Sequence, residues 1–125
     1  MYICIIEVMI MENNFELEHI GINTTNAEEE TGLAKLLCNM FHLEPRHGNK
    51  SEFAGPYFEC MKSPYLGTNG HIAMRTKDLD GSVEELKEKG FSFNMDTAAY
   101  TDDGKLKNIY LEGEYGGFAI HIMQK

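Results

Sequence analysis

A short internal repeat constrains the fold of this chain more than any other feature of its sequence. The run Glu18-His-Ile-Gly-Ile-Asn-Thr24 is echoed by Gly70-His-Ile-Ala-Met-Arg-Thr76, with histidine at the second position of each copy. Alternation of apolar with polar or small residues predicts a strand with one apolar face. A helical pattern follows each copy, at 27–41 and at about 79–89, and Asn26 is suited to cap the first helix.

Three further short strands, separated by turn residues, are expected after each helix. The first set lies at about 43–47, 51–54 and 56–62, and the second at about 91–96, 107–112 and 117–124, with a hairpin turn at Asp102-Asp103-Gly104. The order strand, helix, three strands therefore occurs twice. We expect an α+β fold in which two βαβββ modules, at about 15–66 and 67–125, form a half-barrel sheet with a central cleft.

The charge balance narrows the classes of partner. The 125 residues, enough for one domain, include 20 acidic and 11 basic residues, which gives a formal net charge of -9. Binding to nucleic acid or to an anionic membrane requires a basic face, so neither partner is expected. A small anionic metabolite needs only one or two local Arg or Lys residues. The three cysteines, Cys4, Cys38 and Cys60, form no CxxC pair, which favours reduced thiols in the cytoplasm.

Residues 1–14 are treated as an N-terminal extension. Their apolar stretch, Met1–Ile10, is shorter than the roughly 20 residues that a membrane span needs. It lacks the basic region and the small-residue cleavage site of a secretory signal. Three interpretations stay open: an extra edge strand, part of a subunit contact, or a translation start at Met11.

Strand parity identifies four candidate metal ligands. Side chains alternate between the two faces of a strand, and in four predicted strands one His or Glu lies opposite the most apolar residues. Three imidazoles and one carboxylate suit a divalent cation such as Zn, Ni, Fe, Co or Mn, and a six-coordinate ion would retain two positions for a chelating substrate. Taken singly, a histidine in a strand is more often structural than a ligand. The four candidates are His19, Glu59, His71 and His121.

Further residues are expected near this cluster. Arg75 follows His71 by four residues and shares its face, which makes it the candidate for binding a substrate carboxylate or phosphate. Its alternative is a surface ion pair with Asp78 or Asp80. Glu112 is the alternative carboxylate ligand. The other predicted substrate contacts are Asn23, Tyr57 and Tyr110.

At these positions the chain resembles the vicinal oxygen chelate superfamily, which includes glyoxalases, bleomycin-resistance proteins and extradiol dioxygenases. The resemblance covers about 15–125 and rests on the doubled module plan and on four short runs. It implies that the four candidates above are metal ligands. Glyoxalase I usually carries at the last position a glutamate that is also the catalytic base, whereas this chain has His121. The runs are Glu18-His-Ile-Gly-Ile, Tyr57-Phe-Glu-Cys-Met, Asn69-Gly-His-Ile-Ala and Ala119-Ile-His-Ile-Met.

A closer resemblance is to the glyoxalase-like domain fused to some bifunctional 2-keto-3-deoxy-6-phosphogluconate and 4-hydroxy-2-oxoglutarate aldolases. It is carried by the runs 58–73, 48–51 and 116–121. The chain does not contain the aldolase barrel or its Schiff-base lysine. The resemblance implies a keto acid or sugar acid as ligand, by association rather than by chemistry read from the residues.

The expected function is that of a metal-dependent lyase or isomerase. Its substrate would be a small anionic oxygenated metabolite, such as a keto acid, sugar acid or hemithioacetal, chelated at the metal. A homodimer is the expected assembly, because the family usually pairs its modules across a dimer and closed two-fold assemblies are the commonest oligomers. The alternatives are a non-catalytic binding module of the bleomycin-resistance type and an accessory partner of a keto-acid aldolase.

Overall fold

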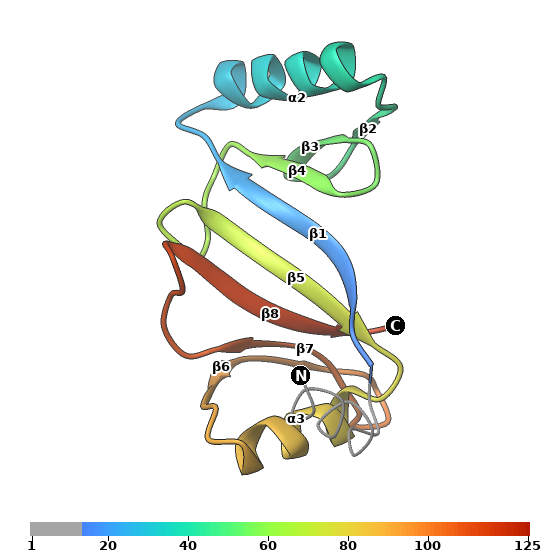
Figure 1. The fold of residues 1–125 in the computed structure, drawn as a ribbon, viewed down its shortest axis with the longest axis vertical. Coiled ribbons are helices and arrows are strands. Elements are labelled where there is room, and N and C mark those ends of the chain that lie inside the picture. The colour runs from blue at the N-terminus through green and yellow to red at the C-terminus, as the bar shows by residue number, and fades with distance from the viewer. Residues whose placement is uncertain (1–13) are drawn as a thin grey trace, which may run out of the picture.

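One mixed sheet of eight strands organises residues 14–125, the part of the chain that the computed structural model describes (Figure 1). The strand order across the sheet is β2-β3-β4-β1-β5-β8-β7-β6. The expected N-terminal extension lies, apart from residue 14, outside the described residues. The elements are β1 (Glu16–Asn23), α2 (Ala27–Phe41), β2 (Pro45–His47), β3 (Ser51–Ala54), β4 (Phe58–Met61), β5 (Gly70–Thr76), α3 (Leu79–Glu88), β6 (Phe93–Tyr100), β7 (Leu106–Leu111) and β8 (Phe118–Gln124).

The sheet contains two modules of the same plan. The first module comprises β1 to β4 with α2, and the second comprises β5 to β8 with α3. In each module the first strand pairs in parallel with the last, β1 with β4 and β5 with β8. The modules join through the antiparallel pair β1 and β5, in which Ile20 lies opposite Ile72. The expected α+β fold of two βαβββ modules is thereby confirmed, and the sheet remains open.

Helix α2 forms with the bounds expected from the sequence. At its start the Asn26 side chain accepts a hydrogen bond from the Glu29 backbone N–H at 2.9 Å, and three glutamates occupy the first turn. This carboxylate charge suits the positive end of the helix dipole. At its end His42 takes the left-handed conformation, with φ 55, and its N–H bonds the Cys38 carbonyl. Both ends of the helix Ala27–Phe41 are therefore capped.

Strand ends follow pairing partners rather than local pattern. β1 begins at Glu16, two residues before the predicted start, because Glu16 pairs with Arg75 of β5. β6 extends to Tyr100, beyond the predicted end near residue 96, because its last residues pair with the start of β7. The predicted turn at 102–104 contains Gly104 with φ +84, a conformation that glycine adopts without strain.

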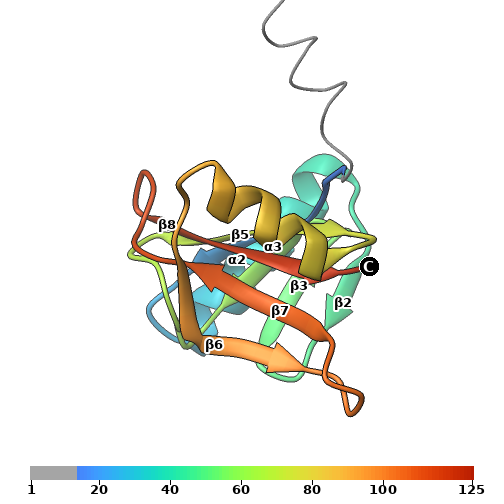
Figure 2. The ribbon, with the colours of Figure 1, turned by 90° about the horizontal axis from the view of Figure 1, so that it is seen from below.

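The two helices pack on the same face of the sheet. α3 packs on β5, β7 and β8, and α2 packs on β2, β3 and β4 (Figure 2). This face presents Ile20 and Ile72, which are paired, and Ile122, which belongs to the core. The opposite face is therefore left for the polar side chains. In the described part of the chain no helix is both long and apolar enough to cross a membrane.

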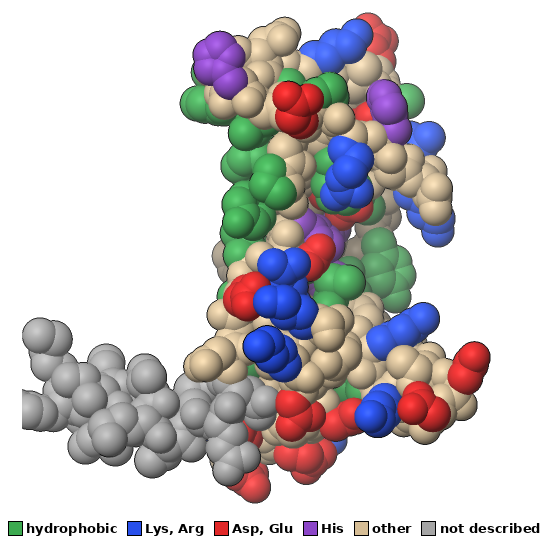
Figure 3. All heavy atoms as spheres, turned by 90° about the vertical axis from the view of Figure 1, so that its right-hand side faces the viewer, with side chains coloured by type: hydrophobic (Ala, Val, Ile, Leu, Met, Phe, Trp, Pro, Cys, Tyr) green, Lys and Arg blue, Asp and Glu red, His purple; other side chains and the backbone are tan. Residues whose placement is uncertain are grey.

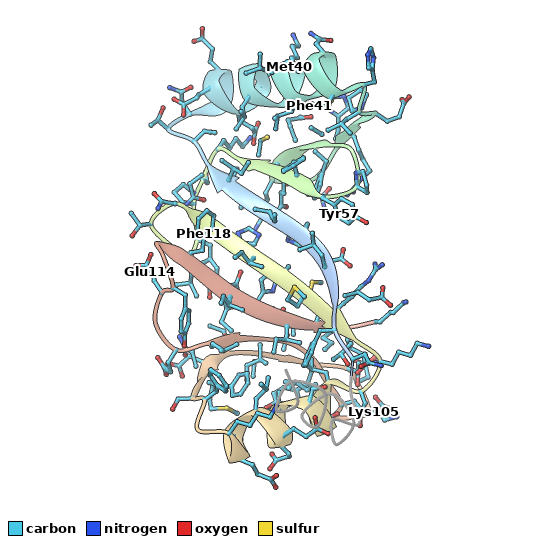
Figure 4. All side chains as sticks on the ribbon, viewed as in Figure 1. Met40, Phe41, Tyr57, Lys105, Glu114 and Phe118 are labelled. Atoms are coloured by element: carbon cyan, nitrogen blue, oxygen red, sulfur yellow. The ribbon has the colours of Figure 1, made fainter. Side chains whose placement is uncertain are left out.

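The hydrophobic core lies mainly in the second module. Among the described residues of the first module, the buried apolar residues are small, namely Ala34, Ala54 and Cys60. Met40 and Phe41, at the end of α2, are each 58% exposed (Figure 4). Free energy from apolar burial scales with buried area, so the second module receives most of it. The core cluster comprises Leu79, Val83, Phe93, Leu106, Ile109, Leu111 and Ile122.

Candidate metal centre

Strand register brings the four candidate ligands to one face of the sheet. Residues directly opposite each other on neighbouring strands share a face. Glu59 of β4 pairs with Gly21 of β1, which pairs with His71 of β5. In the neighbouring row, His19 of β1 and His121 of β8 both pair with Ala73 of β5. In Figure 3, histidine side chains are visible near the middle of the molecule, in a hollow between its upper and lower parts.

The donor atoms of these residues lie close together. The His19 Nε2 atom is 3.1 Å from the Nε2 atom of His71. The Glu59 Oε1 atom is 3.0 Å from His71 Nε2 and 3.4 Å from His19 Nε2. One ring nitrogen from each of the three histidines, His121 included, lies within 4.8 Å of the others. Each module therefore contributes two ligand candidates, one from its first strand and one from its last.

Small residues make room for the imidazole rings. A Cβ atom on Gly21 would lie 2.0 Å from Cε1 of His71, so the His71 ring occupies the space above this glycine. Ala73, fully buried, lies between His19 and His121 in its row, and Ala119 lies opposite His71. Larger side chains at these positions would fill the site.

Neighbouring polar groups orient two of the ligands. The Nδ1 atom of His121 is 2.6 Å from the Asn108 Oδ1 atom, which can only accept, so Nδ1 carries the proton. The Nε2 atom of His121 is then a bare acceptor, buried and without a hydrogen-bond partner among the described residues. The Ser51 hydroxyl donates to Glu59 Oε2 at 2.7 Å, which leaves Oε1 beside the histidines. The Tyr110 ring stacks on His121, with centroids 4.4 Å apart.

The local electrostatics favour the protonation states that metal ligands need. Burial lowers the pKa of His121 to about 3, and the neighbouring His71 and His19 add to the shift. Burial also lowers the pKa of His19, against an opposing effect of Glu59. Burial alone would raise the pKa of Glu59, but hydrogen bonds from His71 and Ser51 outweigh it, and the net pKa lies below the usual value. At neutral pH His19 and His121 are therefore neutral and Glu59 is ionised, as metal binding requires.

This donor set fits a divalent cation. Ligand atoms about 2.1 Å from one ion, at angles between octahedral and tetrahedral values, lie roughly 3.0–3.4 Å from each other. The three separations among His19, His71 and Glu59 are 3.1, 3.0 and 3.4 Å. His121 offers a further donor, because one of its ring nitrogens lies within 4.8 Å of ring nitrogens of His19 and His71. Nitrogen and carboxylate donors together suit borderline metals such as Zn, Ni, Co, Fe or Mn.

Arg75 is engaged by carboxylates. Its guanidinium bonds Glu16 through two nitrogens, at 3.1 and 3.2 Å, and Glu18 through a third, at 3.0 Å. The surface pairing with Asp78 or Asp80 that the sequence left open was wrong, since the partners lie on β1. The charge that was expected to bind a substrate anion is thus already neutralised within the protein.

The other residues predicted to contact the substrate lie in different surroundings. Tyr110 is buried and lies against His121. The Asn23 amide donates to the Gly67 carbonyl at 2.8 Å, and its oxygen is buried without a hydrogen-bond partner among the described residues. Tyr57 is 48% exposed beside the β3–β4 hairpin (Figure 4). Glu112 is exposed directly after β7 and is not among the clustered ligands.

Sequence reasoning did not identify Asn108 and Ser51. Asn108 precedes Tyr110 by two residues in one strand, so parity places both on the same face and was a usable signal. Ser51 carried no such signal, because its contact with Glu59 depends on how β3 pairs with β4.

Solved structures of other proteins have a similar arrangement of helices and strands. A hypothetical protein, BH1468 from Bacillus halodurans C-125, matches with a TM-score of 0.59 at 19% identity, over 92% of this chain and 96% of that one. The methylmalonyl-CoA epimerase of Mycobacterium tuberculosis matches with a TM-score of 0.58 at 13% identity, over 86% of both chains. The chain has the vicinal oxygen chelate fold.

A third similar structure has the same fold. It is a variant of the Streptomyces coelicolor methylmalonyl-CoA epimerase in complex with 2-nitronate-propionyl-CoA, with a TM-score of 0.56 and 14% identity, over 88% of this chain and 94% of that one. No protein-family model and no curated protein sequence matches the chain. At these identities the comparisons establish the fold, and the site must be argued from its own residues.

Proposed function

We propose that this protein binds one divalent metal ion through His19, Glu59, His71 and His121, and that it catalyses a lyase or isomerase reaction on a small oxygenated metabolite that chelates the ion. The observation that carries the proposal is the cluster of donor atoms 3.0–3.4 Å apart beside the buried, unpartnered Nε2 atom of His121. A bare buried acceptor costs free energy unless something binds it. A cation among these atoms would give that acceptor a partner and would also contact His19, His71 and Glu59.

The protein residues in this proposal hold the ion and shape the site. The metal, when bound, would supply Lewis-acid stabilisation of a developing enolate oxygen. Asn108 keeps the Nε2 lone pair of His121 directed into the cluster, and Ser51 holds the Glu59 carboxylate. The Tyr110 ring covers one face of His121 and keeps water from it. Such supporting contacts typically change metal affinity 10- to 100-fold.

Two of the similar structures support the choice of reaction class. Both are methylmalonyl-CoA epimerases, so this fold holds at least one enzyme whose name denotes a change of configuration at carbon. Their sequences are only 13% and 14% identical to this chain, so their names do not identify the substrate of this protein. The proposed metabolite class, a keto acid, sugar acid or hemithioacetal, is the one that the sequence resemblance implies, and each of these compounds carries neighbouring oxygen atoms that can chelate a metal.

One observation favours a second candidate function. Once Glu59 is counted as a ligand, the other carboxylate beside a ligand is Glu18, which lies 3.8 Å from Nδ1 of His19, not from its clustered Nε2 atom, and is bonded to Arg75. No second carboxylate of the described residues is therefore placed among the clustered atoms to carry a proton. A site without such a base suits a module that sequesters a small molecule without converting it. The two functions differ in a measurable way, since only the enzyme exchanges a proton of its ligand.

Metal content is the first test. We expect elemental mass spectrometry to find about one metal ion per chain in wild type and in His47→Ala, and none in His71→Ala. His47 is the matched control because its side chain is 85% exposed and pairs with Glu52 outside the cluster. Wild-type protein that takes up no metal after reconstitution with Zn, Ni, Co, Fe or Mn refutes the proposal. Full metal content in His71→Ala shows that the ligands are misassigned.

Proton exchange separates the enzyme from the sequestering module. Metal-loaded protein is incubated in D₂O with 2-oxo acids, and deuterium at the carbon beside the carbonyl is followed by NMR. Exchange above the rate with His71→Ala supports the enzyme. Tight binding of the same acids without exchange, undiminished after the metal is stripped, supports the sequestering module.

A further inference from the structure

The two arginines of this sequence have different surroundings. Arg75 is bonded to two carboxylates, Glu16 and Glu18, as described above. Arg46 has no Asp or Glu within salt-bridge distance in the described part of the chain.

Arg46 lies on the metal-facing side of the sheet. It pairs with Phe53 of β3, and Phe53 pairs with Glu59 of β4, so the three side chains share the face that carries the histidines. The guanidinium carbon lies 3.8 Å from the centre of the Phe53 ring. That ring meets the His19 ring edge-on, with centroids 6.3 Å apart. These two separations together place the guanidinium within about 10 Å of His19.

Stacking on Phe53 leaves the hydrogen-bond donors of Arg46 available. A guanidinium whose flat face lies over an aromatic ring keeps its N–H groups in its own plane, where they are directed outward past the edge of the ring rather than into it. The same planar edge binds a carboxylate or phosphate through two parallel hydrogen bonds. Arg46 is therefore held in place at the rim of the site with its anion-binding edge free.

We infer that Arg46 is the anion-binding residue of this site, and that the preferred ligand is an oxo acid that chelates the metal at one end and carries a second acidic group at the other. This inference rests on the proposed function. Strands lie about 4.8 Å apart, so β2 is about 10 Å from β4, which carries Glu59. A ligand that reaches both groups must be short, because the guanidinium lies within about 10 Å of His19.

Two probes with the same chelating end test the inference. 2-Oxoglutarate carries a distal carboxylate, and 2-oxovalerate has a methyl group in its place. Their affinities for Co²⁺-loaded protein are measured by titration calorimetry, with the visible spectrum of Co²⁺ reporting chelation. We expect wild type to bind 2-oxoglutarate about five- to tenfold more tightly, as one two-point guanidinium–carboxylate contact provides.

Variants of the two arginines show which of them causes the preference for 2-oxoglutarate. Arg46→Met should bind both probes with the affinity that wild type shows for 2-oxovalerate, and Arg46→Lys should lie between. Arg75→Met should keep the wild-type preference. Loss of the preference in Arg75→Met with its retention in Arg46→Met overturns the inference, and so does a wild type that binds both probes equally. Wild type that takes up no Co²⁺ refutes the proposed function itself, which the metal content shows before any probe is added.

Discussion

Gly21 determines whether His71 can take its place in the site. The His71 ring lies where a β-carbon of residue 21 would be, so the imidazole and any larger side chain compete for one volume. Buried groups in such contact must shift, at a cost of about 1–3 kcal/mol. The proposed metal site therefore depends on a residue that has no ligand atom.

The variant Gly21→Ala tests this dependence. We expect it to lose most of the bound metal and to lower the free energy of unfolding by about 1–3 kcal/mol, measured by elemental analysis and urea denaturation. Gly32→Ala is the matched control, because nothing lies within 4 Å of a Cβ at Gly32 in α2. Alanine favours a helix over glycine by about 1 kcal/mol, so this control should gain stability and keep its metal. Unchanged metal content in Gly21→Ala would show that the His71 ring is placed elsewhere.

Asn108 offers a second residue-level prediction. Asn108→Ala removes the acceptor that fixes the proton on His121 Nδ1. We expect metal affinity to fall about 10- to 100-fold, with little change in the far-ultraviolet circular dichroism. Asn108→Asp keeps the acceptor and should restore most of the affinity. Equal affinities in wild type and Asn108→Ala would contradict the role assigned to this contact.

The candidate ligands were within reach of sequence reasoning, and the state of Arg75 was not. His19, His71 and His121 each alternate with apolar residues in their own strands, so parity, together with the expectation that the apolar sides face the helices, predicted that they share one face. The partners of Arg75 are Glu16 and Glu18, and only the register of β1 on β5 brings them together. Local pattern does not contain that register.

At the scale of elements, the helices were easier to predict than the strands. Helix α2 carries its own start signal in the sequence, Asn26, and in the structure it ends at the left-handed His42. Strands β1 and β6 end where their partners end, so their limits depend on residues far away in the chain. This difference explains why the approximate bounds predicted for α2 agree with the structure and those predicted for β6 do not.

The cap of α2 can be tested directly. Asn26→Ala removes the acceptor for the Glu29 backbone N–H and should lower the free energy of unfolding by about 1 kcal/mol. Asn26→Asp should be close to wild type. Asn39→Ala, an exposed asparagine inside the same helix, should not destabilise the protein. The measurement is urea denaturation, and equal loss in the Asn26→Ala and Asn39→Ala variants would show that the cap has no special role.

At the scale of the whole molecule, the two modules differ in packing and share the site. The core cluster lies in the second module, whereas the first module buries only small apolar residues beneath α2. His19 and Glu59 come from the first module, and His71 and His121 from the second. A metal ion bound by these four residues, as proposed above, would link the less well packed module to the better packed one.

Metal binding should therefore stabilise the folded chain as a whole. A free metal concentration 100 times the dissociation constant raises the free energy of unfolding by about 2.7 kcal/mol, provided that the unfolded chain does not bind it. We expect this gain in wild type by calorimetry or urea denaturation, and none in His121→Ala. A gain of the same size in that variant would place the metal at other residues.

Hydrogen exchange should show which module opens first. Without metal, the amides of β3 and β4 are expected to exchange faster than those of β7 and β8, because fewer large apolar side chains cover them. Metal should slow β3 and β4 the most. Equal protection of the two modules without metal would contradict the difference in packing.

The division of the candidate ligands between the two modules also affects when the site forms during synthesis and folding of the chain. His19 and His71 are 52 residues apart, and the cluster exists only where the two modules meet along β1 and β5. A nascent chain that has completed only its first module holds two of the four ligands and cannot yet retain a metal tightly. Under the proposed function, only chains in which both modules have folded would then contain the metal. A chain that misfolds in either module would lack the metal and its stabilising effect, and proteases would degrade it more readily.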